Sequence, residues 1–207
     1  LRQVREARRQ ADWVIVSLHY HEMGGPSFLT AQKKTDQEHC AAFVTDVARR
    51  CIDEGADIVV CHGPHYMLGV ELYKGKPIFH SLGNVILQND TVRFLPAHAY
   101  SRLSLDNNAT PADFLDARSK GDTRSMPAEP LYWQTVCAVC KFASGKLKQV
   151  NLYPLDLGYG RPRSQRGRPL IADVEYGREI IARIARISKA LGAEIAYQDG
   201  CGTVVGI

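Results

Sequence analysis

Two apolar stretches, WVIVSL at residues 13–18 and DIVVC at residues 57–61, decide the fold class of this chain. Each is a short continuous apolar run, which is typical of a strand buried on both faces of a sheet. Between them, apolar residues repeat with helical spacing until Gly55 ends the pattern. Residues 12–61 are therefore predicted to form a β-α-β unit with two parallel strands, which indicates an α/β fold.

The helix of this unit is predicted to begin at a capping box formed by Thr35 and Glu38. Its buried face is predicted from residues three and four positions apart. These residues are Cys40, Phe43, Val44, Val47, Ala48 and Cys51.

Beyond this unit the sequence predicts further strands and one more long helix. They are strands at 70–73 and 78–81, a hairpin of 132–142 with 146–155, a helix at 173–188 and a short C-terminal strand. Between them, residues 88–130 are polar and contain four prolines, so this segment is expected to be long and irregular.

The composition excludes several classes of protein. The chain has 207 residues, of which 45% are hydrophobic and 23% are charged, and these values exclude wholesale disorder. No apolar run approaches the roughly 18 residues that a transmembrane helix needs. A net charge of +4 is too small to indicate a nucleic-acid-binding protein.

The six cysteines do not form the dense pattern of a disulfide framework. Cys137 and Cys140 are three residues apart in a predicted strand, so they face opposite ways and make a poor zinc site. The cysteines are therefore expected to be buried free thiols.

Polar side chains follow three of the predicted strands, in the segments HYHE at 19–22, HGPH at 62–65 and HSLGN at 80–84. Five of the seven histidines lie in these segments. The carboxyl ends of strands in α/β sheets are common ligand sites, and imidazoles and carboxylates are ligands for zinc, manganese or iron. The segments therefore predict a metal or acid–base site, whereas a single histidine after a strand is more often structural.

The run from Ala11 to Asn84 closely resembles the CapA-type proteins, which are poly-γ-glutamate capsule biosynthesis proteins with a calcineurin-like metallophosphatase fold. The resemblance rests on ADWVIVSLHYHE at 11–22, EGADIVVCHGPH at 54–65 and GVELYKGKPIFHSLGNVI at 69–86. It continues more loosely to the end of the chain. The family pattern has glycine and histidine where this chain has Cys61 and Gly63.

The resemblance implies the C-terminal portion of a metallophosphatase-like α-β-β-α sandwich, formed by residues 1–207. It assigns His19, His62 and His65 as metal ligands and His21 and Glu22 as the general base or the residues that orient it. Asn84, Arg161 and Arg163 are the expected substrate-binding residues. Further ligands are expected upstream of Leu1, so the full-length protein is expected to hold two divalent ions of zinc, manganese or iron.

Two functions follow from the resemblance. One is a metal-dependent hydrolase that acts on a phosphoester or an acidic polymer. The other is a non-catalytic binding or assembly subunit of a capsule-synthesis complex, in which arginines of the loop 158–169 bind a polyanion. Nucleic acid is not an expected partner. The resemblance also implies a membrane-associated or extracytoplasmic location.

Overall fold

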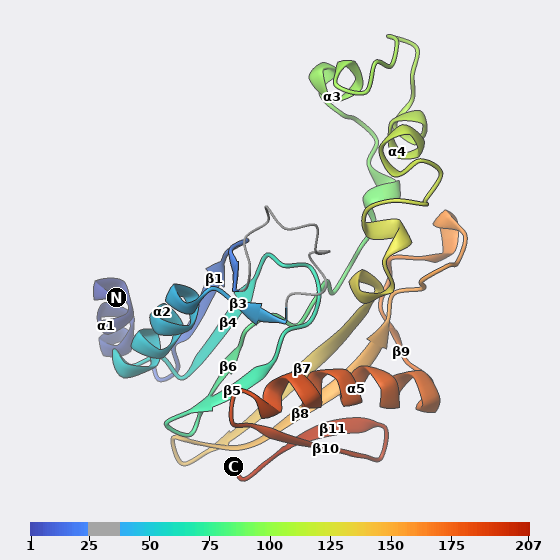
Figure 1. Cartoon of the computed structure of the whole chain (residues 1–207). Helices are drawn as coiled ribbons and strands as arrows, with labels where there is room; N and C mark the ends of the chain where they lie inside the picture. Colours follow the sequence, from blue (N-terminus) through green and yellow to red (C-terminus); the bar gives the residue numbers. More distant parts are fainter. Residues whose placement is uncertain (25–37) are drawn as a thin grey trace.

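The predicted β-α-β unit is present in the structure, which is a computed structural model that describes residues 1–24 and 38–207. Strand β1 (Ile15–His19) pairs in parallel with β4 (Ile58–His62), and helix α2 (Ala42–Asp53) lies between them in the sequence. Helix α1 (Arg2–Gln10) precedes the unit. Figure 1 shows α1 and α2 together beside this sheet. The α/β class is confirmed.

The first sheet is completed by a hairpin of β5 (Val70–Tyr73) and β6 (Lys76–Phe79). The two strands are antiparallel, and β6 pairs in parallel with β4, so the strand order is β1-β4-β6-β5. The predicted strand–turn–strand pattern at residues 70–81 is therefore confirmed.

The prediction that residues 13–18 form a strand buried on both faces is wrong. Strand β1 lies at the edge of the first sheet, and exposed and partly buried residues alternate along it. Trp13 is 44% exposed and Ile15 is 63% exposed. The apolar run arises because Val16 and Leu18 pack under the helices while Ile15 lies on the opposite face.

Helix α2 begins later than the capping box predicted. Thr35 lies outside the described residues, and Glu38 precedes the helix and pairs with Arg186. Before the helix, β3 (His39–Cys40) pairs with β2 (Met23–Gly24). The predicted buried face of α2 is correct only in part. Its buried members are Val44, Ala48 and Cys51, whereas Phe43 and Val47 are exposed.

A second sheet packs against the first through a shared apolar core. Its strand order is β10-β11-β8-β7, and β9 also pairs with β8. The strands are β7 (Gln134–Ala143), β8 (Lys146–Asp156), β9 (Leu170–Ile171), β10 (Glu194–Gln198) and β11 (Cys201–Val205). The β7–β8 hairpin is as predicted, and the C-terminal region forms two strands where one was expected.

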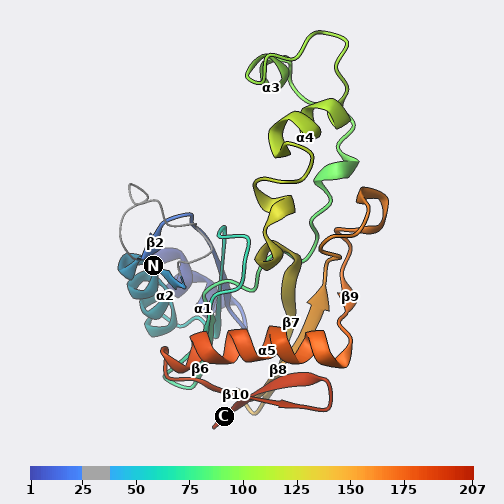
Figure 2. The same ribbon diagram turned by 45° about the vertical axis from the view of Figure 1, so that its right-hand side comes forward.

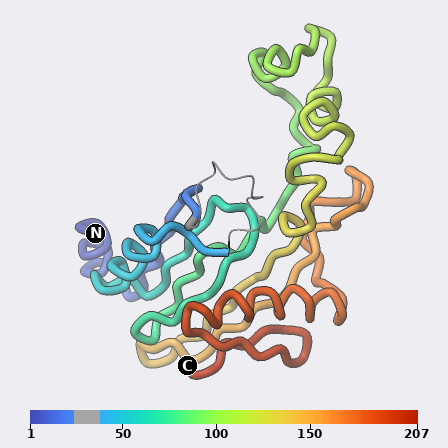
Figure 3. Tube along the Cα trace, viewed as in Figure 1, coloured from blue at the N-terminus to red at the C-terminus, as the bar shows by residue number. Residues whose placement is uncertain are grey.

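The last helix, α5 (Val174–Lys189), is capped by Asp173 and packs its isoleucines into the core between the sheets. Figure 2 shows it running across β7 and β8. Its buried isoleucines are Ile180, Ile181, Ile184 and Ile187, as the sequence predicted. Figure 3 follows the chain from α1, beside the first sheet, to the C-terminal strands beside α5. Within residues 1–24 and 38–207, no helix is long and apolar enough to cross a bilayer.

The segment 88–130 contains two α-helices, although the sequence indicated an irregular chain. They are α3 (Ala97–Ser101) and α4 (Pro111–Ser119), and Figures 1 and 2 show them projecting away from the two sheets. Helix α4 begins at a capping box of Thr110 and Asp113. Short 3₁₀ helices lie at Asn89–Thr91, Met126–Ala128, Pro130–Trp133 and, outside the segment, Arg163–Gln165.

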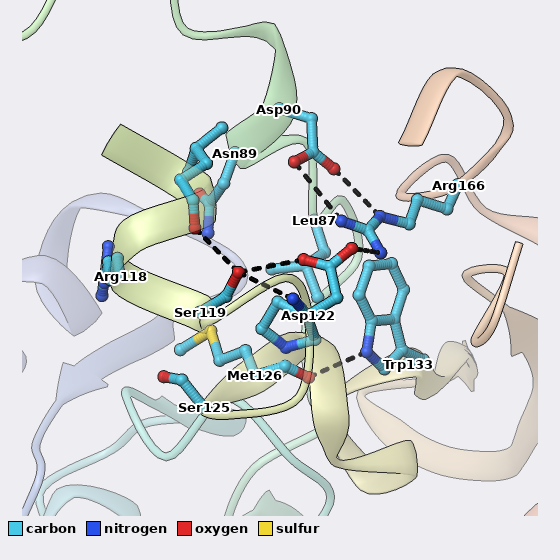
Figure 4. Close-up of a pocket in the computed structure, with 12 residues that line it drawn as sticks. Leu87, Asn89, Asp90, Arg118, Ser119, Asp122, Ser125, Met126, Trp133 and Arg166 are labelled. Carbon is cyan, nitrogen blue, oxygen red and sulfur yellow. Dashed lines mark hydrogen bonds and ion pairs between the residues drawn. The ribbon is translucent and has the colours of Figure 1, made fainter. Parts of the chain in front are cut away.

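A partly buried ion-pair cluster anchors the base of this projection (Figure 4). Arg166 donates to Asp90 (Nε–Oδ2 3.0 Å) and to Asp122 (Nη1–Oδ2 2.8 Å). Its guanidinium also lies over the Trp133 ring, 5.1 Å from the centroid. The cluster joins segments about 40 to 75 residues apart in the sequence. It therefore fixes the loop 158–169 against the projecting segment 88–130.

This cluster should make stability depend on acidic pH. Hydrogen bonds from Arg163 and Arg166, against a smaller opposing effect of burial, lower the pKa of Asp122 to about 2. Because the unfolded pKa is about 3.9, the stabilisation is present above about pH 4 and is lost as the pH falls toward 2. We expect Asp122→Asn to lower the melting temperature at pH 7 and to match the wild type near pH 2. An equal difference in melting temperature between Asp122→Asn and the wild type at both pH values would contradict this expectation.

Candidate metal site

Two of the predicted metal ligands end neighbouring strands of the first sheet. His19 is the last residue of β1 and His62 is the last residue of β4, and the two are paired in the parallel register. Their ring centroids are 4.9 Å apart, and both side chains are exposed. Register, rather than proximity in sequence, therefore brings these imidazoles together at one edge of the sheet.

His21 extends this pair. Its Nε2 atom lies 3.1 Å from Nε2 of His19. Two ring nitrogens at this distance either share one proton or direct two lone pairs at one cation. Two nitrogen ligands of a tetrahedral ion with bonds of about 2.1 Å would be about 3.4 Å apart, so the observed separation is close to that of ligand atoms.

His65 completes the group, and its orientation is set by Asn84. The ring centroids of His65 and His21 are 5.9 Å apart. Nδ2 of Asn84 donates to the carbonyl of Tyr132 (3.3 Å), which identifies Oδ1 as the atom 3.0 Å from Nδ1 of His65. Nδ1 of His65 must then carry the proton, so in the neutral imidazole Nε2 has the free lone pair that a metal requires.

Ser17 is a further residue of the site that the sequence did not indicate, and Gly63 has a structural role there. Ser17 places its hydroxyl 2.7 Å from Nε2 of His62, and it shares the strand face of His19 because the two are separated by one residue. Gly63 has φ +123°, and a Cβ there would lie 1.8 Å from the carbonyl oxygen of Tyr20. Gly63, which replaces the histidine of the family pattern, therefore allows residue 63 to lie directly against the backbone of Tyr20.

Glu22 is exposed, and its carboxylate accepts a hydrogen bond from the backbone N–H of His21 (3.0 Å). Hydrogen bonds from the backbone of His21 and of Glu22 itself hold the pKa of Glu22 below its ordinary value. A carboxylate with a lowered pKa is a weak base, so this environment favours an orienting role for Glu22 over general-base catalysis.

The histidines at the strand ends do not by themselves form a group of three metal-holding side chains. Across residues 1–24 and 38–207, no three histidine, cysteine, aspartate or glutamate side chains are arranged to hold a metal ion. The structure nevertheless places His19, His21, His62 and His65 in one chain of neighbouring rings. Their chemistry suits zinc, manganese or iron. Metal binding by these residues stays a prediction.

The arginines expected to bind substrate have carboxylate partners within the protein. Arg161 pairs with Asp156 (2.6 Å), and Arg163 pairs with Asp116 (2.7 Å) and Asp122 (2.9 Å). These contacts neutralise the charges that a polyanion would need. Asn84 contacts His65 and so lies within the site, whereas Arg161 and Arg163 belong to the base of the projection. Substrate binding by the three residues stays a prediction.

Comparisons with known proteins agree with the motifs that form this site. Residues 1–89 match the family described as bacterial capsule synthesis protein PGA_cap. The chain is 34% identical to the uncharacterized protein y4sH of Sinorhizobium fredii over 99% of this chain and 43% of that protein. It is also 32% identical to the PGA biosynthesis protein CapA of Bacillus subtilis, over 44% of this chain and 20% of that protein.

A third similarity is to the capsule biosynthesis protein CapA of Bacillus anthracis. The two are 40% identical over 47 residues, which is 23% of this chain and 11% of that protein. The chain thus spans less than half the length of each of these relatives.

Proposed function

Because this chain belongs to the bacterial capsule synthesis protein PGA_cap family, we propose that it contributes part of a metal-dependent, hydrolase-like site to capsule or poly-γ-glutamate biosynthesis. The observation that supports this most is the row of imidazoles at the ends of β1 and β4, with His65 held by Asn84 in the tautomer that a metal ligand needs.

In this proposal His19, His62 and His65 hold a divalent ion of zinc, manganese or iron, and the full-length protein supplies the remaining ligands and a second ion. A bound divalent ion would polarise the scissile group and lower the pKa of a coordinated water. His21 would accept or return a proton at a ring nitrogen beside this site, since an imidazole has a pKa near neutrality. Glu22 orients the segment through its hydrogen bond from the His21 backbone.

The substrate in this proposal is an acidic polymer or a phosphoester, and the other subunits of a capsule-synthesis complex are its partners. The names of the relatives from the two Bacillus species support the link to capsule or polyglutamate synthesis. The alternative is a polyanion-binding assembly subunit, and of the arginines proposed for it Arg161 and Arg163 are paired with carboxylates and so offer less free charge to a polyanion.

The proposal is tested by measuring metal content and hydrolysis in the purified full-length protein. We expect bound zinc, manganese or iron by elemental analysis, and metal-dependent hydrolysis of a generic phosphodiester or of poly-γ-glutamate that is lost with a chelator and recovered with the metal. Bound metal without hydrolysis of either substrate would favour the assembly subunit. Absence of metal from a folded protein would refute the site.

Asn84→Ala should weaken metal binding through His65. The substitution removes the acceptor for the Nδ1 proton, so His65 loses its fixed tautomer and orientation. Loss of such a partner typically lowers metal affinity by about 10- to 100-fold. A competition titration with a chromogenic chelator measures the change. Asn107→Ala, at an exposed position, is the matched control and should leave the affinity unchanged. An unchanged affinity in Asn84→Ala would remove this residue from the site.

A further inference from the structure

Cys40, His80 and Glu71 form a second polar group on the α2 side of the first sheet. His80 lies between the other two and contacts both. His80 follows β6 and is 1% exposed, and Glu71 on β5 is 3% exposed. Nε2 of His80 lies 3.1 Å from Oε2 of Glu71, and Nδ1 of His80 lies 3.3 Å from the Sγ atom of Cys40. This is the order of a nucleophile, a base and a carboxylate that orients the base.

The group is separate from the candidate metal site. Tyr20, whose hydroxyl donates to the carbonyl of His80, packs in the core beneath α2. Because side chains alternate along an extended chain, the neighbouring His19 faces the other side of the sheet. The chemistry of this group is therefore independent of metal binding by the histidines at the ends of β1 and β4.

The protonation of this group follows from its contacts. Glu71 also accepts from Nε of Arg49 (2.7 Å), so its carboxylate is charged and can only accept from His80. Nε2 of His80 therefore carries a proton, and Nδ1 faces the sulfur. Burial opposes a charge on His80, but its hydrogen bonds to Cys40 and Glu71 outweigh burial and raise the pKa of His80 to about 9. Burial opposes a charge on Cys40 as well, but the hydrogen bond and charge of His80, together with hydrogen bonds from Thr45 and Tyr20, outweigh burial and lower the pKa of the Cys40 thiol.

Two more features stabilise a negative sulfur at Cys40. The hydroxyl of Thr45 lies 3.2 Å from Sγ and can donate to it. Cys40 also lies two residues before the start of the twelve-residue helix α2, whose N-terminus favours a thiolate. The side chain is partly exposed, in contrast to Cys51 and Cys61, which are buried. Burial raises the pKa of both of those thiols. All six cysteines are free, but only these two are buried as the sequence analysis expected.

We propose that Cys40 is a site of covalent thiol modification, at which a thiolate paired with the His80 imidazolium reacts with a hydroperoxide. The sulfur attacks the terminal oxygen, so an S–O bond forms and the O–O bond breaks. The leaving alkoxide or hydroxide takes the proton from Nδ1 of His80. Cys40 is oxidised by two electrons to a sulfenic acid, and the hydroperoxide is reduced to an alcohol or to water.

Cys137 serves as an internal reference for the reactivity of Cys40 in the wild-type chain. Cys137 on β7 is exposed and is therefore more accessible than Cys40. At pH 7 an ordinary thiol with a pKa near 8.5 is about 3% thiolate, so a lowered pKa can increase the reactive form by at most about 30-fold. Partial exposure and the weaker nucleophilicity of a stabilised thiolate reduce this gain to about tenfold.

The test is limited alkylation by iodoacetamide at pH 7, followed by peptide mass mapping. We expect Cys40 to react about tenfold faster than Cys137, and His80→Gln to remove this advantage without changing Cys137. A Cys40 rate no greater than that of Cys137, or an advantage that persists in a folded His80→Gln variant, would overturn the proposal. The comparison within the wild type decides the point even where His80→Gln fails to fold.

A second measurement tests the oxidation itself. After treatment with one equivalent of hydrogen peroxide, dimedone should trap a sulfenic acid at Cys40 and not at Cys137, and Cys40→Ser should give no adduct. Absence of an adduct at Cys40, or equal adducts at the two cysteines, would overturn the peroxide reaction.

Discussion

Replacing His65 by alanine in the full-length protein is expected to reduce metal-dependent hydrolysis by at least about 100-fold while the fold persists. Removal of a partner that only orients a ligand costs about 10- to 100-fold, and His65 is a proposed ligand itself. The side chain is only partly buried at the end of a strand, so its loss removes little packing. The measurements are turnover, bound metal by elemental analysis and a thermal melt.

The backbone at His65 requires a second variant. Its φ of 72° lies in the left-handed region, which asparagine adopts more readily than alanine does. His65→Asn therefore removes the imidazole with less backbone strain, and it should lose activity as His65→Ala does. His98→Ala, at an exposed histidine on α3, should keep full activity. A His65→Asn protein with wild-type turnover would exclude this residue from the mechanism.

Val59→Asp is expected to unfold the protein. Val59 is 0% exposed in β4, between β1 and β6, and all its neighbours in the core cluster are apolar except for the tyrosine hydroxyls. An unpaired carboxylate there costs several kcal/mol, which is comparable with the total of about 5–15 kcal/mol that stabilises a domain. We expect no cooperative thermal transition by circular dichroism.

Val205→Asp provides the matched control for this substitution. Val205 is 49% exposed near the end of β11, so the same change should alter the free energy of unfolding by no more than about 0.5 kcal/mol. Cooperative melting of Val59→Asp near the wild-type temperature would contradict the central position assigned to β4.

Local patterns were sufficient for most of the secondary structure. The runs at 13–18 and 57–61, the Lys74–Gly75 turn and the isoleucine stripe of α5 each involve residues close together in the chain, where local sequence reports directly on a strand, turn or helix. The start of α2 was misplaced because Glu38, which the capping-box spacing put in the first turn of the helix, lies before it and pairs instead with Arg186. Helix α4 was missed although Thr110 and Asp113 have the same spacing.

The sequence by itself determined the β-α-β unit, the two hairpins and the positions of the histidines after strands, because these depend on residues close together in the chain. Only the tertiary structure decided which side chains meet. The register of β1 and β4 joins His19 to His62, packing of the 80–84 segment joins Asn84 to His65, and the same sheet turns His80 toward Cys40. Each of these contacts spans 19 to 43 residues, and strand register and side-chain alternation set them rather than any local pattern.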